Sequence, residues 1–190
     1  MVYNRSMSKI VLGSASPRRK QLLGRVVSDF EVRRSSADER CLLTSPSQYV
    51  MYTAAKKARG VRLAEGELLV TADTIVWHKG AFLGKPTSDE DAKRMLTSLN
   101  HSVNTVYTGV GLTDGTRYDL FFEASEVRID MTDAAIDAYV SAGYARDKAG
   151  AYGIQDPTLT ATLLSGSLDN VVGLPVDALR RHLAAFGYKE

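Results

Sequence analysis

The sequence predicts a mixed α/β fold in which a twisted sheet of six or seven strands is flanked by five helices. Strand-like and helix-like patterns alternate along most of the 190 residues, and neither an internal repeat nor a linker rich in Pro, Gly or Ser divides them. Some successive strands are separated by a helix and others by a tight turn, which favours a mixed sheet over a purely parallel one. The content of 44% hydrophobic residues is enough for one domain with a sizeable core.

The first part of the chain is expected to contain two short strands and two helices. Ser16 and Pro17 supply an N-cap and a proline at the first helical position. Between Pro46 and Gly66, apolar or small residues recur at helical spacing, which predicts a long helix. The expected elements are a strand at 9–13, a helix at 16–24, a strand at 30–34 and a helix at 47–64.

The rest of the chain is expected to contain two hairpins and three more helices. A run of β-branched residues leads into Lys79-Gly80, and two long strand patterns flank Asp114-Gly115; both dipeptides are typical of tight turns. Ser88 precedes three acidic residues, which a helix dipole favours in the first turn. The expected elements are strands at 68–78 and 81–83, a helix at 88–100, strands at 103–112 and 118–131, and helices at 132–142 and 174–186.

Composition excludes several classes of protein. The 24 Lys and Arg against 22 Asp and Glu leave a net charge of +2, which gives no bulk electrostatic basis for binding a nucleic acid polymer or an anionic membrane. The single Cys41 excludes an internal disulfide and a Cys-rich zinc site. No apolar stretch at the N-terminus is as long as that of a signal peptide. No segment approaches the about 20 apolar residues that a membrane helix needs. We therefore expect a soluble, cytoplasmic protein with a loose extension at 1–8 and one domain at 9–190.

The turn between the first strand and the first helix is a candidate phosphate site. Free amides at a helix N-terminus bind phosphate, the hydroxyls of Ser14 and Ser16 add hydrogen-bonding groups, and the guanidinium groups of Arg18 and Arg19 match phosphate oxygens. The alternative is a capped surface helix with solvated arginines. The spacing is neither that of a Walker loop nor that of a dinucleotide fingerprint.

Asp73 interrupts an otherwise apolar strand pattern. A buried carboxylate is costly unless it is paired or holds a metal. It could bind a neighbouring backbone amide at a strand bend, which would be a structural role. Near bound phosphates it could instead hold a divalent cation or take a proton from water.

Three lysines and one glutamine stand in unusual settings. Lys57 lies on the long helix, Lys85 follows a hairpin between Gly84 and a proline, and Lys148 begins a loop whose glycines allow close approach of the backbone to a ligand. Gln155, at the end of that loop, carries a donor and an acceptor that could recognise a base edge, although a buried structural amide is equally consistent with the sequence. Each lysine alone is more often a solvated side chain.

The chain offers no nucleophile paired with a base. Cys41 lies in a polar stretch, and His78, His101 and His182 occur in unrelated contexts, so neither a Cys-His pair nor a His metal cluster can be built. The remaining chemistry combines a carboxylate with cations, which suits phosphate esters.

Seven short blocks occur in the order and at the spacings of the Maf family, which the chain resembles from about residue 9 to 186. The blocks are Ser14–Arg19, Asp38–Glu39, Lys57–Ala58, Ala72–Val76, Gly84–Pro86, Lys148–Gln155 and Asn170–Pro175. The resemblance implies a nucleoside triphosphate pyrophosphatase that uses a divalent metal, Mg²⁺ or Mn²⁺, in the house-cleaning of nucleotide pools. It also implies a fold similar to inosine triphosphatases and Ham1 proteins, with two lobes and a central cleft.

The resemblance is to the family branch that acts on dTTP and UTP. Ala72–Thr74 and the glycine loop at 149–155 are similar to that branch, whereas the branch acting on 7-methyl-GTP has other residues there. In two places the chain departs from the family: Asp156 stands where a glycine usually follows the glutamine, and 157–165 matches the family's strand poorly. These departures concern the shape of the base pocket.

The resemblance assigns roles to single residues. Asp73 matches the proton acceptor, and the cationic side chains would neutralise the triphosphate while water attacks the α-phosphorus. The expected catalytic residues are Asp73, Glu39, Lys57 and Lys85; the expected substrate-binding residues are Ser14, Ser16, Arg18, Arg19, Thr74 and Gln155; the expected metal ligands are Glu39 and Asp73. A homodimer is also plausible for a family member.

Two alternatives accompany this interpretation. One is a pyrophosphatase for 7-methyl-GTP or another modified nucleotide. The other is a regulator of cell division that binds a nucleotide without hydrolysing it, and the presence of Asp73 and Glu39 favours the enzyme over it.

Overall fold

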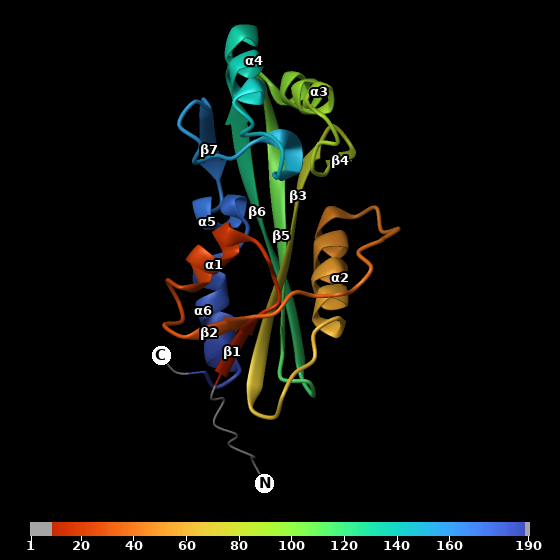
Figure 1. Ribbon diagram of the computed structural model, residues 1–190, viewed down its shortest axis with the longest axis vertical. Coiled ribbons are helices and arrows are strands. Elements are labelled where there is room, and N and C mark those ends of the chain that lie inside the picture. Colours follow the sequence, from red (N-terminus) through yellow and green to blue (C-terminus); the bar gives the residue numbers. More distant parts are fainter. Residues whose placement is uncertain (1–8, 189–190) are drawn as a thin grey trace. The chain divides into compact units, whose positions relative to one another are not determined.

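A computed structural model describes residues 9–188, so the extension expected at 1–8 lies outside the described residues. The chain forms two compact units (Figure 1). Within the described residues, the first unit comprises 9–73, 108–123 and 173–188, and the second comprises 74–107 and 124–172.

Seven strands form one sheet within residues 9–188, in the order β2-β1-β3-β5-β6-β7, with β4 paired to β3. The strands are β1 (Lys9–Leu12), β2 (Phe30–Val32), β3 (Glu67–His78), β4 (Ala81–Leu83), β5 (Ser102–Thr113), β6 (Tyr118–Ile129) and β7 (Ala161–Ser165). β1 is parallel to both β2 and β3, whereas β3–β4 and β6–β7 are antiparallel. The predicted mixed sheet is therefore confirmed, and β7 is a strand to which the sequence analysis assigned no element.

The described residues contain six α-helices and one short 3₁₀ helix. They are α1 (Pro17–Leu23), α2 (Pro46–Arg59), α3 (Asp89–Leu99), α4 (Asp133–Ser141), η1 (Ala149–Ala151), α5 (Leu168–Val172) and α6 (Val176–Ala185). The predicted caps of α1 and α3 are confirmed, because the Ser16 and Ser88 hydroxyls each accept a backbone N–H of the first turn.

Two predicted helix boundaries are wrong. The second helix was expected to continue to Ala64 but ends at Arg59, and Gly60 is its C-cap. Gly60 lies against the loop after β2, where a Cβ would stand 2.4 Å from the Ser35 hydroxyl oxygen. The last helix was expected from Leu174 but begins at Val176, because the backbone of Pro175 is extended.

In the first unit, helices cover both faces of the sheet (Figure 1). Gly109 of β5 lies directly under the α2 backbone, and Leu120 of β6 packs over Gly111 on that same face. Successive strand residues point to opposite faces. Asp119 therefore points to the other face, where its carboxylate lies 2.6 Å from the ring Nδ1 of His182 on α6.

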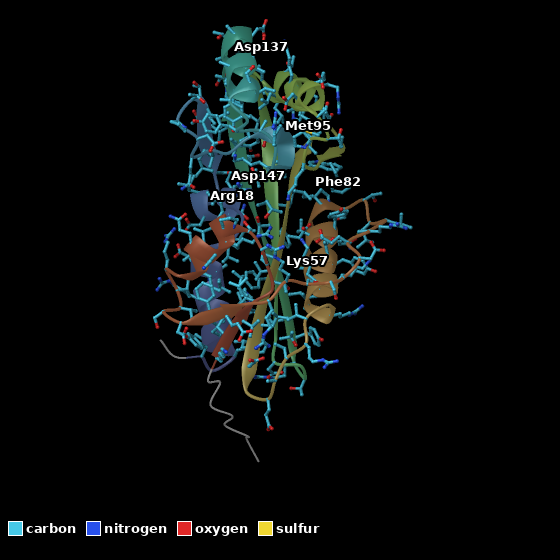
Figure 2. All side chains as sticks on the ribbon, viewed as in Figure 1. Arg18, Lys57, Phe82, Met95, Asp137 and Asp147 are labelled. Carbon is cyan, nitrogen blue, oxygen red and sulfur yellow. The ribbon has the colours of Figure 1, made fainter. Side chains whose placement is uncertain are left out.

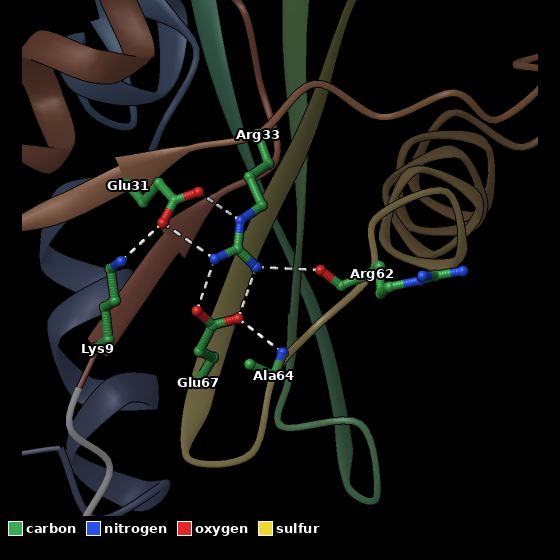
Figure 3. Close-up of polar contacts among 6 residues, drawn as sticks. All are labelled: Lys9, Glu31, Arg33, Arg62, Ala64 and Glu67. Atoms are coloured by element: carbon green, nitrogen blue, oxygen red, sulfur yellow. Dashed lines mark hydrogen bonds and ion pairs between the residues drawn. The ribbon is translucent and has the colours of Figure 1, made fainter.

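An ion-pair network joins the three parallel strands of the first unit (Figure 3). The Arg33 guanidinium donates two bonds of 2.6 Å to the Glu67 carboxylate, and two bonds of 2.6 and 3.0 Å to Glu31. Glu67 is only 6% exposed and also accepts the Ala64 amide at 2.8 Å. These bonds hold the pKa of both carboxyl groups below their usual range, that of Glu31 at about 2. Arg33 thus ties β2 to the start of β3.

The second unit has an apolar core of its own. α3 packs against α4 and η1, and their apolar side chains meet those of β3, β5 and β6. The largest of these buried side chains are Leu96, Leu99, Ile129, Ile136 and Tyr139.

None of the helices in residues 9–188 is both long enough and apolar enough to span a lipid bilayer.

Candidate functional site

The predicted phosphate turn is folded by its own hydroxyl groups. The Ser16 hydroxyl accepts the Arg19 amide at 3.4 Å, and the Ser14 hydroxyl accepts the Ser16 amide at 3.2 Å. A guanidinium nitrogen of Arg19 donates to Ser14 at 3.4 Å, and its Nε donates to the Gly173 carbonyl at 2.9 Å. Ser14, Ser16 and Arg19 are thus brought together at the start of α1, which Gly173 joins from far along the chain.

Burial lowers the pKa of Arg19, and the negative charges of Asp73 and Glu39 oppose that effect. A guanidinium remains charged despite such a shift. Arg19 therefore carries a poorly hydrated positive charge near two carboxylates of the first unit. Arg18 extends from the same helix and is half-buried (Figure 2).

Lys57 connects the two predicted carboxylates. Its ammonium lies 2.7 Å from a carboxylate oxygen of Asp73 and 3.2 Å from one of Glu39. The side chains of Lys57 and Asp73 are 12% and 13% exposed, whereas that of Glu39 is 58% exposed. The Asp73 carboxylate within the apolar strand is thus explained by its ion pair with Lys57 of α2. Lys57, Asp73 and Glu39 were all predicted as site residues.

Glu39 reaches Lys57 because the loop after β2 is attached to the end of α2. The amide and hydroxyl of Ser36 both donate to the Gly60 carbonyl, at 3.2 and 3.3 Å. Since Gly60 leaves no room for a side chain beside this loop, the loop and the helix end lie in close contact. The helix end therefore sets the position of the loop that carries Glu39.

In the second unit, the two loops with predicted lysines are joined by the backbone. Gly150 donates its amide to the Gly84 carbonyl at 3.0 Å. Its φ of 68° is in the left-handed region, and a Cβ would stand 2.8 Å from a methyl group of Val76, so glycine is needed on both grounds. Lys85, next to Gly84, is exposed.

Gln155 and Thr74 also belong to the second unit, where Gln155 is exposed and Thr74 half-buried. The buried-amide alternative for Gln155 is therefore wrong. A cluster beside Gln155 was not predicted in the sequence analysis: the Tyr139 hydroxyl donates to Asp156, and Lys148 lies 3.3 Å from the same carboxylate oxygen. Asp156 was singled out there only as a departure from the family pattern.

The carboxylates of Asp73 and Glu39 have the chemistry of ligands for a divalent cation. Both contact one ammonium ion, so their oxygen atoms converge on a common point of positive charge. Carboxylate oxygens are the ligands that Mg²⁺ and Mn²⁺ prefer, and Mg²⁺ usually keeps several waters and substrate phosphates beside one or two carboxylates. Within residues 9–188, no group of three or more His, Cys, Asp or Glu side chains forms a ready metal cage. The donor pair fits a cation that shares its ligands with a substrate.

The arrangement in the first unit suits the chemistry of phosphates. Arg18, Arg19 and Lys57 carry positive charges of the kind that bind phosphate oxygens. An ionised carboxylate such as Asp73 can accept a proton from water. Asp73 also holds the Lys57 ammonium in an ion pair of 2.7 Å.

Comparisons with known proteins find similar sequences over most of the chain. A family model described as Maf-like protein matches residues 9–186. A protein of Thermococcus onnurineus (strain NA1), named dTTP/UTP pyrophosphatase, is 41% identical over 170 residues, which cover 88% of this chain and 92% of that protein. A protein of Bacillus thuringiensis subsp. konkukian (strain 97-27) with the same name is 40% identical over 184 residues, which cover 95% and 96%.

A solved structure supports the fold independently. The Staphylococcus aureus Ham1 protein matches with a TM-score of 0.55, covering 94% of this chain and 100% of that chain at 13% sequence identity. At this identity the likeness bears on the fold alone. It confirms the predicted fold class.

Proposed function

The chain belongs to the Maf family, and we propose that it is a nucleoside triphosphate pyrophosphatase that hydrolyses dTTP and UTP to the monophosphate and pyrophosphate. The observation that carries the proposal is the half-buried Lys57 ammonium held between Asp73 and Glu39. Relatives about 40% identical over most of their length are named for this activity. No covalent intermediate is needed.

The proposed chemistry begins with charge neutralisation. Arg18 and Arg19 at the start of α1 bind phosphate oxygens, and the Ser14–Ser16 turn orients the phosphate chain. Lys57 adds positive charge where the pyrophosphate leaves, and the catalytic role of Lys85 stays a prediction from the sequence. These groups stabilise the negative charge that develops as the bond to the α-phosphorus breaks.

Asp73 is the proposed proton acceptor. In its ionised form, it takes a proton from the water that attacks the α-phosphorus. Lys57 orients this carboxylate through the 2.7 Å contact. A divalent cation, held by Glu39 and Asp73, would neutralise phosphate charge and make the attacking water more acidic.

The choice of base is proposed to depend on Thr74 and Gln155. The exposed amide of Gln155 carries one acceptor and two donor hydrogens, which can discriminate between base edges. The cytoplasmic location and the homodimer expected from the sequence stay predictions.

The test is the release of pyrophosphate from dTTP, UTP, CTP, GTP and 7-methyl-GTP with Mg²⁺ or Mn²⁺. We expect the monophosphate and pyrophosphate from dTTP and UTP, and we expect a metal chelator to abolish the release. Asp73→Asn keeps the shape of the side chain but removes the proton acceptor, which typically costs 10²- to 10⁴-fold in rate. The control is Asp177→Asn, an equal change on α6 of the same unit.

Three results would contradict the proposal. Orthophosphate with a nucleoside diphosphate would show that a different bond is cut. A clear preference for 7-methyl-GTP would support the other enzymatic alternative. Full turnover by Asp73→Asn at saturating metal would leave Asp73 with the role of holding Lys57 alone.

A further inference from the structure

The turn that presents Gln155 is held at both ends by one buried hydroxyl group. The Asp156 amide donates to the Gly153 carbonyl at 2.8 Å, so residues 153–156 form a β-turn with Gln155 as its third residue. At one end the Gly153 amide donates to the Tyr139 hydroxyl at 3.0 Å. At the other end the Tyr139 hydroxyl donates to the Asp156 carboxylate. Tyr139 therefore connects the first residue of the turn with the last.

Tyr139 is a rigid support for this turn. Tyr139 lies on α4 and is fully buried in the core of the second unit. The centroid of its ring lies 5.5 Å from that of the Tyr144 ring. Burial, and then the bond to Asp156, raise the pKa of Tyr139. The hydroxyl therefore stays protonated at neutral pH and remains a donor to the Asp156 carboxylate.

Lys148 holds the same carboxylate from the other side. Its ammonium donates to the Tyr144 carbonyl at 2.5 Å and lies 3.3 Å from Asp156 and 3.4 Å from Asp147. An ammonium has three N–H donors, and these three acceptors can take all of them. Lys148 is only 13% exposed, so its arrangement suits the fixing of the loop better than the binding of a phosphate.

We propose that Asp156 is a positioning residue for base selection: its bonds to Tyr139 and Lys148 fix the turn at 153–156 and thereby the direction in which Gln155 presents its amide. This inference rests on the proposed function, in which Gln155 recognises the base. Asp156 itself does not contact the substrate in this assignment.

The physical basis of selection is the order of donor and acceptor on the base. Uracil presents an acceptor where cytosine presents a donor, as the O4 of thymine and the N4 of cytosine illustrate. A Gln155 amide held in one direction pairs its donor and acceptor with the groups of one base. Against the other base it leaves a hydrogen-bonding group unpaired. An amide on a loose turn can rotate to suit both. A loosened turn should therefore reduce discrimination more than it reduces the affinity for the preferred base.

The test compares binding of α,β-imido-UTP and α,β-imido-CTP by calorimetry, so that it does not depend on turnover. Asp156→Ala and Tyr139→Phe should each reduce the preference for the uridine analogue, by up to roughly tenfold for one lost hydrogen bond. Asp156→Asn keeps an oxygen that can accept the Tyr139 hydroxyl and should retain most of the preference. The matched control is Asp147→Ala, which removes the more exposed carboxylate from the same lysine.

A second measurement follows the turn itself. Hydrogen exchange of the Gly153 and Asp156 amides should accelerate in Asp156→Ala and remain close to that of the unchanged protein in Asp147→Ala. Thermal unfolding of every variant checks that the second unit stays folded.

The outcomes separate the two proposals. Selective binding of the uridine analogue without release of pyrophosphate from UTP would contradict the proposed function and leave the positioning role intact. An unchanged preference in Asp156→Ala, or unchanged amide exchange, would overturn the positioning role and leave the function intact. Equal binding of both analogues by the unchanged protein, an unaltered preference in Gln155→Ala, or binding of neither analogue would overturn the inference.

Discussion

Replacing Gly109 by alanine should damage the activity through the position of a helix. Gly109 lies on β5 beneath α2, and a Cβ there would stand 2.4 Å from the Val50 carbonyl carbon and 2.6 Å from the Met51 nitrogen. All the nearest atoms belong to the helix backbone, which cannot rotate away as a side chain can. The helix must therefore move outward by roughly 1 Å to reach the 3.4 Å at which ordinary contact begins.

The cost in stability has two opposing parts. Overpacking of a well-packed interface typically destabilises a protein by about 1–3 kcal/mol. Gly109 does not have a positive φ, so alanine is compatible with its backbone and stabilises by about 0.4–1 kcal/mol through the unfolded state. The expected result is a net loss of about 1–2 kcal/mol in the free energy of unfolding.

The cost in activity should be larger, because α2 carries Lys57. Lys57 follows Val50 by two helical turns, so a shift of the helix also displaces the ammonium from its 2.7 Å contact with Asp73. A misplacement of about 1 Å in a catalytic group can cost about 10²-fold in rate. The assay is kcat/KM for UTP, measured below the melting temperature of the variant, beside the free energy of unfolding from a urea titration.

Two other glycines of the first unit supply graded controls. At Gly111, two residues along β5, a Cβ would meet the Thr71 hydroxyl at 2.9 Å but the α2 backbone only at 3.6 Å, so we expect a small effect on activity. At Gly24, the nearest atoms are 3.5 Å away, so alanine should be neutral or slightly stabilising. If Gly109→Ala were as active and as stable as Gly24→Ala, the close contact between β5 and α2 would not position Lys57.

Two further predictions concern the cations of the first unit. Arg19→Ala should weaken the binding of all four ordinary nucleoside triphosphates by a similar factor and make the affinity less sensitive to salt. Calorimetry at two salt concentrations measures both effects, and a change in base preference would contradict this role. Arg33→Met should lower the melting temperature more than Lys9→Met does, because Arg33 holds the buried Glu67 whereas Lys9 forms only an exposed pair with Glu31. Since the folded pKa values of both glutamates are depressed, this stabilisation is present above pH 5 and is lost as the pH falls through those values, that of Glu31 being about 2. The two variants and the unchanged protein should therefore converge in acid.

Local signals in the sequence predicted much of the fold. Ser16 before a proline, Ser88 before acidic residues and Asp114-Gly115 between long strand patterns each act over a few residues, and each gave the correct helix start or hairpin. The end of α2 was missed because the residues after it keep apolar side chains at helical spacing. Val61 and Leu63 pack against the core of the first unit from an irregular segment, which periodicity alone cannot distinguish from a helix.

In the candidate site, too, contacts between neighbouring residues could be predicted from the sequence, whereas contacts between distant residues could not. The turn at Ser14–Arg19 is built from neighbouring residues, and its hydroxyl bonds follow from the sequence. The pairing of Tyr139 with Asp156 joins a helix to a loop 17 residues later, and nothing in the local pattern indicates which face of α4 meets that loop. Strand β7 is paired to β6 across a register shift at Glu126, which also requires knowledge of the tertiary structure.

The geometry around Lys57 depends on positions that carry no functional group. Gly109 allows α2 to lie on β5, and Gly60 allows the loop with Glu39 to lie against the end of α2. Because protein interiors are close-packed, a methyl group at either position must displace backbone rather than fill a void. The charged side chains of Lys57, Asp73 and Glu39 stand out in the sequence, whereas these two glycines do not. The contacts between the three charged groups nevertheless require both, since one glycine sets the height of the helix above the sheet and the other sets the approach of the loop.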